Sequence, residues 1–340
     1  MAASKNGIAF AGNILVDVIK TIDAYPEKGM LCNISDIAYS VGGCVPNTAI
    51  NLAKIDPSIP LSAVGRVGKD EYGQYVTGVM QQYGIDTANV TVSEAAPTSF
   101  TDVMNIRSGE RTFFHARGAN KEFAPTHVDL SRLNCDILHI GYILLLDSFD
   151  APDAEYGTAM ARFLHDVQAQ GIKTSVDAVS DSTADYSKTI LPALKYCDYA
   201  ILNEIESTTI WGLSPRTADG KLHVENIRET MRRMAESGVR EKVIIHAKEA
   251  GFAYDVATGE FTVLPSLAVP KDQIKGSTGA GDSFCAASLY GLYHGLSDRE
   301  ILEFASTAAV CNLFADNGID GMRTADEIKK MSAEYDRQQM

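Results

Sequence analysis

Short apolar segments alternate with longer amphipathic segments along most of the chain. The apolar segments are rich in β-branched residues, a pattern that is typical of strands buried on both faces of a sheet. The amphipathic segments are typical of helices that cover such a sheet. The expected strands are Ile8–Val16, Leu61–Val64, Asp136–Ile140, Lys173–Asp177, Tyr199–Leu202 and Val243–His246. The expected helices are Asn47–Lys54, Glu71–Tyr83, Ala154–Gln170, Thr189–Tyr196 and Val224–Ser237.

This alternation predicts an α/β fold, doubly wound, with a mostly parallel sheet flanked by helices. Two regions interrupt it, and one of them contains two strand-like runs around the sequence RSGE at 107–110, which is typical of a hairpin turn. We therefore expect one domain over residues 1–340 with a small β-sheet lid formed by about 18–41 and 98–117. Ordinary surface loops are the alternative. A further hairpin is expected over 251–264.

The composition narrows the class of protein. The chain has 340 residues, with 30 basic and 44 acidic side chains and a formal net charge of −14. This acidity argues against a nucleic-acid partner or an anionic membrane surface. No apolar run is long enough to span a bilayer, and no secretory signal pattern opens the chain. The six scattered cysteines favour a reducing compartment, so we expect a cytoplasmic protein. The spacing of the histidines gives little support for a zinc site.

The most informative segment is KGSTGAGDSF at 275–284, which opens an expected helix. Gly279 and Gly281 remove side chains where a ligand must approach the backbone closely. The free N–H groups at a helix N-terminus favour an anion. An anion hole beside the carboxylate of Asp282 suits phosphoryl transfer, because the amides stabilise the phosphoryl oxygens while the carboxylate orients the acceptor hydroxyl. An aspartate with an ordinary pKa of about 3.9 suffices for a loose transition state. A helix-capping role is the alternative for Asp282.

Five motifs together resemble those of the ribokinase-like, PfkB-type carbohydrate kinases. The GAGD sequence resembles the family's C-terminal signature, and VGGCVPNTA resembles its N-terminal signature. GNILVD resembles the first strand with its substrate-binding aspartate, VGRVGKDEYG the loop after the next strand, and NEIE the N-x-x-E motif. GAGD occupies 279–282 and VGGCVPNTA occupies 41–49. GNILVD occupies 12–17, VGRVGKDEYG 64–73 and NEIE 203–206. Because all five occur in the family's order, the chain is identified as a member of that family.

The resemblance implies a ribokinase-like fold and an ATP-dependent kinase that phosphorylates a hydroxymethyl group of a small sugar. The sugar would be ribose-, fructose- or ketosugar-acid-like. A nucleoside kinase of the same family is the alternative, and a non-catalytic sugar sensor is a third possibility, which the intact GAGD sequence disfavours. The implied small-molecule partners are the sugar and ATP, with Mg²⁺ as the metal. Because the edge of the lid can pair with a second chain, a homodimer through the lid is a further expectation.

The resemblance also implies roles for individual residues. The catalytic residues are Asp282, as the base, with Gly279, Ala280 and Gly281 as the anion hole. The substrate-binding residues are Asp17, Gly42, Gly43, Asn47 and Arg117. The nucleotide-binding residues are Asn203, Lys248, Gly251, Gly281 and Asn312. Glu206 is the metal residue and would act on Mg²⁺ through water, since Mg²⁺ commonly keeps several of its waters.

Some of these roles have a local alternative. Asn47 offers a donor and acceptors for a sugar diol, but it could instead cap a helix. Arg107, His115 and Arg117 could each contact an acidic or phosphorylated sugar, and Arg117 is preferred because it follows the lid strand back to the core. Each of them could equally be a solvated surface group.

The chain departs from the family pattern at two places. The sequence at 276–278 is GST, where the family often has an aspartate, and many relatives build a monovalent-cation site nearby, so a K⁺ ion is left open. In the loop at 246–251, Lys248 replaces the first of two glycines, so the preference for ATP rests on the resemblance. The sequence does not identify the sugar.

Overall fold

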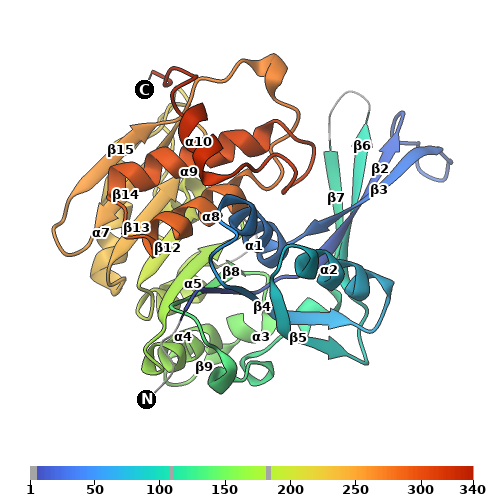
Figure 1. Cartoon of the computed structure of the whole chain (residues 1–340), viewed down its shortest axis with the longest axis horizontal. Coiled ribbons are helices and arrows are strands. Elements are labelled where there is room, and N and C mark those ends of the chain that lie inside the picture. The colour runs from blue at the N-terminus through green and yellow to red at the C-terminus, as the bar shows by residue number, and fades with distance from the viewer. Residues whose placement is uncertain (1–5, 107–110, 181–184, 340) are drawn as a thin grey trace.

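The computed structural model describes residues 6–106, 111–180 and 185–339 (Figure 1). The expected turn at 107–110, with Arg107, lies outside the described residues. The strands are β1 Ile8–Ala11, β2 Leu15–Ile22, β3 Ile34–Gly42, β4 Leu61–Gly68, β5 Asp86–Ser93, β6 Ser99–Ile106, β7 Arg111–Ala116, β8 Ile137–Ile143, β9 Pro152–Asp153, β10 Gly157–Thr158, β11 Lys173–Ala178, β12 Tyr199–Asn203, β13 Lys242–His246, β14 Ala250–Asp255 and β15 Phe261–Pro265.

The helices complete the list of elements. They are α1 Cys44–Ile55, α2 Glu71–Gln82, α3 Asp147–Asp150, α4 Ala159–Ala169, α5 Tyr186–Leu194, α6 Glu204–Thr209, α7 Val224–Ser237, α8 Ala280–Tyr293, α9 Asp298–Leu313 and α10 Ala325–Met331. Short 3₁₀ helices occupy Gly118–Lys121, Pro125–His127, Leu130–Arg132 and Lys271–Gln273. No helix in the described part of the chain is long and apolar enough to cross a membrane. The cytoplasmic location stays a prediction.

The large sheet has nine strands in the order β15-β14-β13-β12-β11-β8-β1-β4-β5. The strands from β13 to β5 pair in parallel, and β14 and β15 continue the sheet as an antiparallel hairpin. The hairpin expected over 251–264 is therefore confirmed, as is the mostly parallel sheet. Because the strands are parallel, their carboxyl ends meet at one edge, where α/β folds bind ligands.

Helices cover both faces of the large sheet, as a doubly wound fold requires (Figure 1). Helices α1, α8 and α9 pack on one face, and α4, α5 and α7 pack on the other. The central strand β1 shows why its sequence is apolar throughout. Its Ile8 and Phe10 side chains lie in one core, whereas Ala9 and Ala11 lie in the core on the opposite face.

The expected strand Ile8–Val16 is in fact two strands in different sheets, so that prediction was wrong. The chain turns after β1 at Gly12, whose φ of 131° is unfavourable for any other residue. A Cβ at Gly12 would also lie 2.7 Å from the carbonyl oxygen of Gly141. The apolar pattern could not show this break, because Ile14 and Val16 after the turn are as buried as the residues before it.

The expected helix Ala154–Gln170 begins later than predicted. The strands β9 and β10 form a two-stranded hairpin before it, and Gly157 in that hairpin has a φ of 88°. Thr158 then caps the helix, because its Oγ1 accepts a hydrogen bond from the N–H of Ala161 at 3.2 Å. The polar helix-compatible residues before Thr158 therefore belong to the hairpin and a turn.

A second sheet of four strands, in the order β3-β2-β6-β7, projects from the large sheet (Figure 1). Strands β2 and β6 pair in parallel, and the outer strands β3 and β7 pair antiparallel to them. Lys20 on β2 and Asp102 on β6 form an ion pair at 2.5 Å across the central pair. We call this element the small sheet. Its strand β7 contacts the loop before α8, because Arg111 donates a hydrogen bond to the Thr278 hydroxyl.

Candidate active site

The carboxyl ends of β8, β11, β12 and β13 and the N-terminus of α8 surround a cavity of about 260 Å³. Among the residues that line it are five that the sequence singled out: Asn203, Glu206, Gly279, Gly281 and Asp282. They come from two distant segments of the chain, and the parallel sheet places both at the same edge. The structure therefore brings the expected phosphate, metal and base residues together, although their roles stay predictions.

Gly279 shapes the backbone at the start of α8. Its φ of 76° lies in the left-handed region, and a Cβ there would lie 2.5 Å from the Cα of Gly318. Only glycine can occupy this position without a shift of the backbone. The following amides belong to the first turn of α8, where N–H groups have no partner within the helix.

Ala280 differs from its two glycine neighbours. Gly279 and Gly281 line the cavity, but the N–H of Ala280 donates a hydrogen bond to the carbonyl oxygen of Ser277 at 3.2 Å. That amide is already used within the loop. The expected anion hole therefore consists of fewer amides than the sequence suggested.

Asp282 is buried at the floor of the cavity with two donors directed at its carboxylate. The Asn47 side-chain amide donates to Oδ2 at 2.9 Å, and the Tyr142 hydroxyl lies 3.2 Å from both carboxylate oxygens. Burial, reinforced by the nearby charge of Asp177 and opposed by the hydrogen bonds from Asn47 and Tyr142, raises the pKa of Asp282 to about 7. The ordinary pKa assumed from the sequence is therefore wrong for this carboxyl group. A base with a pKa near 7 is matched to proton transfer at neutral pH.

Tyr142 and Asp177 are site residues that the sequence analysis missed. Tyr142 has a φ of 62°, a conformation that costs free energy in a non-glycine residue. Its backbone N–H donates to Oδ1 of Asp177 at 2.5 Å. The signal was available for Asp177, because it ends the expected strand Lys173–Asp177 where ligands bind in such sheets.

Asn203 and Glu206 form a capping box at the start of α6. Glu206 Oε2 accepts from the backbone N–H of Asn203 at 3.0 Å. Its Oε1 accepts from the Asn203 side chain at 2.7 Å and from the Ser180 hydroxyl at 3.0 Å. Burial raises the pKa of Glu206 to about 8, opposed by the Asn203 hydrogen bond and reinforced by the charge of Asp177. Glu206 and Asp177 are two buried carboxylates at one cavity, and such a pair fits a divalent cation. Because both oxygens of Glu206 already accept hydrogen bonds, they fit a contact with the ion through water.

Asp17 lies on β2 and lines a separate, much smaller recess of about 10 Å³, which has room for about one water molecule. Of these two cavities, Asp17 lines only the smaller and Asp282 only the larger. Burial raises the pKa of Asp17 to about 7, while a hydrogen bond from Thr101 and the charge of Arg111 lower it. The charge of Asp17 also raises the pKa of Asp282, so the two carboxyl groups interact electrostatically.

Arg111 connects the small sheet to the core, and the sequence analysis missed it. Its Nη1 donates to the Thr278 hydroxyl at 2.9 Å and to the carbonyl oxygen of Asp316 at 3.2 Å. Arg111 and Thr278 line the recess of Asp17, and Gly279, next to Thr278, lines the larger cavity. These contacts hold β7 against the loop that precedes α8.

The N-terminal glycine motif surrounds Asp17 and Asp282. A Cβ at Gly42 would lie 2.6 Å from Oδ2 of Asp17, so this glycine makes room for the carboxylate. Gly43, with a φ of 87°, directs the chain into α1. Asn47 follows in α1, and its Oδ1 is buried without a hydrogen-bond partner among the described residues. That oxygen is available to a hydroxyl donor of a ligand.

Three of the expected contact residues lie away from both cavities. Arg117 forms an ion pair with Asp147. Lys248 is exposed, and its carbonyl oxygen accepts from the Gln338 side chain at 3.3 Å. Gly251 lies in β14, where a Cβ would be 3.1 Å from Leu302, so its small size is explained by packing against α9.

Asn312 has a supporting position. It is buried in α9, and its side-chain amide donates to the carbonyl oxygen of Thr278 at 2.7 Å. It thereby holds the loop that leads to Gly279. His246, which the sequence analysis did not select, lines the cavity at the end of β13. Burial lowers the pKa of His246 to about 4, so the ring is neutral, and it packs at 4.9 Å from the ring of Phe284.

Known proteins share both sequence and structure with this chain. The model of the pfkB family of carbohydrate kinases matches residues 5–325. A 5-dehydro-2-deoxygluconokinase of Shouchella clausii is 24% identical over 305 residues, which cover 86% of each protein. The structure of Arabidopsis thaliana ribokinase complexed with ribose and ATP is similar, with a TM-score of 0.79 and 21% identity over 96% of this chain and 99% of that one.

An E. coli protein assigned as ribokinase II, in complex with ATP and Mg²⁺, has a TM-score of 0.75 and 18% identity over 97% of this chain and 99% of that one. The fold is therefore ribokinase-like, as the sequence predicted.

Proposed function

Because the chain belongs to the pfkB family of carbohydrate kinases, and so transfers a phosphoryl group to an alcohol, we propose that it phosphorylates the hydroxymethyl group of a small keto-sugar acid with ATP. The observation that carries the proposal is the cavity in which the buried Asp282 adjoins the bare backbone of Gly279 and Gly281. The named relatives support a sugar acid, because one of them is a 5-dehydro-2-deoxygluconokinase.

The geometry supports a direct transfer. The oxygen of the sugar hydroxyl would bond to the γ-phosphorus of ATP while the bond from that phosphorus to the ADP oxygen breaks. The Asp282 carboxylate would accept the proton of the hydroxyl. The N–H groups at the start of α8 would donate to the phosphoryl oxygens that carry the developing charge. Asn47 and Tyr142 would hold the carboxylate in place through the hydrogen bonds described above.

ATP and Mg²⁺ are supported by the E. coli protein assigned as ribokinase II, whose structure contains both. The residues present fit the ion, since Glu206 and Asp177 are buried carboxylates at one cavity. Mg²⁺ would neutralise phosphate charge there, and Asn203 and Glu206 would hold its waters. Nothing in the described residues supports a K⁺ site, and that expectation stays open.

We also propose that the small sheet acts as a lid over the sugar. The recess beside Asp17 is too small for a sugar in this structure, and Arg111 bridges it to the core. Substrate entry therefore requires β7 to move away from Thr278. On closure, the Arg111 guanidinium would exchange its ion pair with Asp316 for a substrate carboxylate, and the lid would exclude water from the transfer.

A panel of acceptors tests this function. The purified chain is assayed with ATP and Mg²⁺ against 5-dehydro-2-deoxygluconate, ribose, fructose and nucleosides, with ADP formation as the readout. The sugar acid is expected to give the highest kcat/KM, and Arg111→Lys is expected to lower this preference over neutral sugars about 10-fold or more. Phosphorylation of nucleosides alone would overturn the sugar proposal, and an unchanged preference in Arg111→Lys would remove that residue from recognition.

Glu206→Gln is expected to raise the Mg²⁺ concentration required for half-maximal rate about 10- to 100-fold, because it weakens a contact made through water. Glu204→Gln is the matched control. Glu204 lies in the same helix but forms an ion pair with Arg216 at 2.7 Å, outside the cavity. An equal effect of the two variants on the Mg²⁺ titration would exclude a specific role for Glu206.

The outer strands of the small sheet support a homodimer. They expose large apolar side chains, and the strand register places Ile37, Tyr39 and Phe114 on the same face of the small sheet. Exposed apolar patches of this kind mark protein contacts, and a second copy of the chain is the occupant that we propose. Analytical ultracentrifugation is expected to show a dimer that Ile37→Glu shifts to monomer, whereas Val92→Glu on β5 leaves it unchanged. A monomeric wild-type chain would exclude the dimer.

A further inference from the structure

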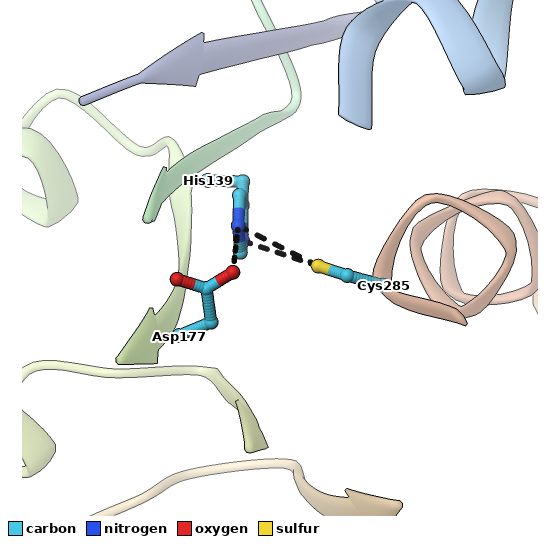
Figure 2. Close-up of side chains that lie close together, drawn as sticks. All are labelled: His139, Asp177 and Cys285. Atoms are coloured by element: carbon cyan, nitrogen blue, oxygen red, sulfur yellow. Dashed lines mark hydrogen bonds and ion pairs between the residues drawn. The ribbon is translucent and has the colours of Figure 1, made fainter. Parts of the chain in front are cut away.

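Three potential metal ligands meet beneath the cavity. His139 on β8, Asp177 on β11 and Cys285 on α8 point toward one another, and all three are buried (Figure 2). The Nε2 atom of His139 lies 3.5 Å from Oδ2 of Asp177 and 3.5 Å from Sγ of Cys285. One atom from each side chain lies within 4.8 Å of the other two.

The separation of the imidazole from the carboxylate matches a metal site better than a hydrogen bond. In a tetrahedral zinc site, bonds of about 2.0–2.3 Å place neighbouring ligand atoms about 3.3–3.6 Å apart. An N–H···O hydrogen bond is shorter, about 2.9 Å, so the imidazole and the carboxylate are too far apart to satisfy each other well. Both distances from Nε2 are therefore those expected between ligands of one cation.

Neighbouring groups already orient two of the ligands. The Nδ1 atom of His139 lies 3.0 Å from the Ser175 hydroxyl. With the proton on Nδ1 donated to Ser175, the lone pair of Nε2 faces Asp177 and Cys285. The other carboxylate oxygen of Asp177 accepts from the backbone of Tyr142 at 2.5 Å, which directs Oδ2 toward the imidazole. Such second partners are typical of metal-binding histidines and carboxylates.

The donor set selects the chemical class of the ion. One imidazole nitrogen, one carboxylate oxygen and one thiolate sulfur suit Zn²⁺ or another borderline-soft divalent cation. Mg²⁺ prefers oxygen ligands only, so it would use Asp177 with Glu206, whereas this group adds an imidazole and a thiolate to the same Asp177. Three protein ligands leave a fourth position, and Asp177 and Cys285 both line the cavity from which it can be filled.

We propose that His139, Asp177 and Cys285 bind a zinc ion, with water or a ligand oxygen from the cavity as the fourth donor. Binding replaces the thiol proton of Cys285 by the metal and releases that proton to solvent, with no change of oxidation state. The ion would engage Asp177, which lines the same cavity as Asp282 and Glu206. Zinc is therefore expected to inhibit the phosphoryl transfer proposed above.

Cobalt is the probe for the site, because a Co²⁺–thiolate bond gives a near-ultraviolet charge-transfer band and tetrahedral Co²⁺ gives intense visible bands. The metal-free wild-type chain is expected to bind one Co²⁺ with both features, and Zn²⁺ is expected to displace it. Cys285→Ser is expected to lose the charge-transfer band. Loss of a group that only orients a metal ligand typically weakens metal binding about 10- to 100-fold. Cys285→Ser and His139→Gln each remove a direct ligand, so each is expected to weaken Zn²⁺ binding by more than that.

Two matched controls separate this site from other thiols. Cys44 lies nearby, but its Sγ accepts from the backbone of Asn13 at 3.3 Å, and Cys197 is buried elsewhere among the residues of the opposite core. Cys44→Ser and Cys197→Ser are expected to keep the charge-transfer band. Loss of the band in Cys44→Ser but not in Cys285→Ser would overturn the proposal, as would a wild-type chain without the band. Thermal unfolding of each variant checks that it is folded.

Inhibition is measured separately, so that a failed kinase proposal leaves the binding result intact. The rate with and without Zn²⁺ is compared within each variant, and EDTA is expected to restore the wild-type rate. His139→Gln is expected to be at least about 10-fold less sensitive to Zn²⁺ than Cys197→Ser. Equal sensitivity of these two variants to Zn²⁺ would show that the proposed site does not mediate the inhibition. The Co²⁺ spectra would still decide whether the site binds a metal.

Discussion

Asp282→Asn is expected to lower the turnover number by about 10²- to 10⁴-fold, the usual contribution of a general base. Asparagine keeps the shape of the side chain and can still accept from Asn47 and Tyr142, so the affinity for the sugar is expected to change little. Turnover is measured with saturating ATP and acceptor, and sugar binding by calorimetry. Near-normal turnover would remove Asp282 from the role of base.

The same variant is expected to be more stable than the wild type above neutral pH. The carboxyl group has a pKa of about 7 in the native state against 3.8 when exposed, so the native state holds the proton more tightly between these values. The stability from this group is complete below about pH 4 and is lost as the pH rises through about 7. The loss amounts to about 4 kcal/mol at about 1.4 kcal/mol for each pKa unit, and Asp282→Asn avoids it.

Asp150→Asn is the matched control for both measurements. Burial also raises the pKa of Asp150 to about 7, but its carboxylate accepts from the backbone of Leu144 and Leu146 and does not line either cavity. We expect this variant to become more stable relative to the wild type as the pH rises, because it avoids the same loss, and to keep its turnover. Thermal melts without Mg²⁺ at about pH 5 and pH 8 compare the variants with the wild type. A pH-independent difference for Asp282→Asn would contradict the raised pKa.

Gly279→Ala is expected to have the second large effect, a loss of about 10²-fold in turnover together with a lower melting temperature. An alanine at a φ of 76° costs about 1–2 kcal/mol, and its Cβ would lie 2.5 Å from the backbone of Gly318. The loop must shift to relieve this contact, and a shift of about 1 Å of the phosphoryl-binding amides is enough for such a loss of rate.

Gly84→Ala is the control that separates the effect of backbone strain from the effect of displacing the loop before α8. Gly84 has a φ of 75°, almost the same as that of Gly279, but a Cβ there would meet nothing within 4 Å. We expect Gly84→Ala to lower the melting temperature through strain alone and to leave turnover unchanged. If Gly279→Ala lowers stability no more than Gly84→Ala and retains turnover, the loop does not position the transferred phosphoryl group.

The apolar pattern of the sequence was sufficient to predict the large sheet and the helices that cover it. Strands buried on both faces must be apolar at every position, so the segments around Ile140, Val176 and Ile244 could be located without any knowledge of their partners. The pattern failed at Gly12 because both sides of the turn are buried, in one sheet before it and close to another after it. A turn inside a buried region leaves no polar signal.

Local chemistry predicted the residues whose role depends on their own segment. The glycines at 279 and 281 beside Asp282, and the capping box of Asn203 and Glu206, can be recognised from a few neighbouring residues. The missed residues depend on distant partners. Arg111 matters because the small sheet places it against Thr278, which is 167 positions later in the chain.

The sequence by itself thus determined the fold class, the family and the segment that carries the proposed chemistry, because periodicity and backbone conformation are local properties. Only the tertiary structure decided the raised pKa of Asp282, its contacts with Asn47 and Tyr142, and the meeting of His139 with Cys285. These depend on desolvation and on distances between atoms from different strands and helices, and both arise only when the chain has packed.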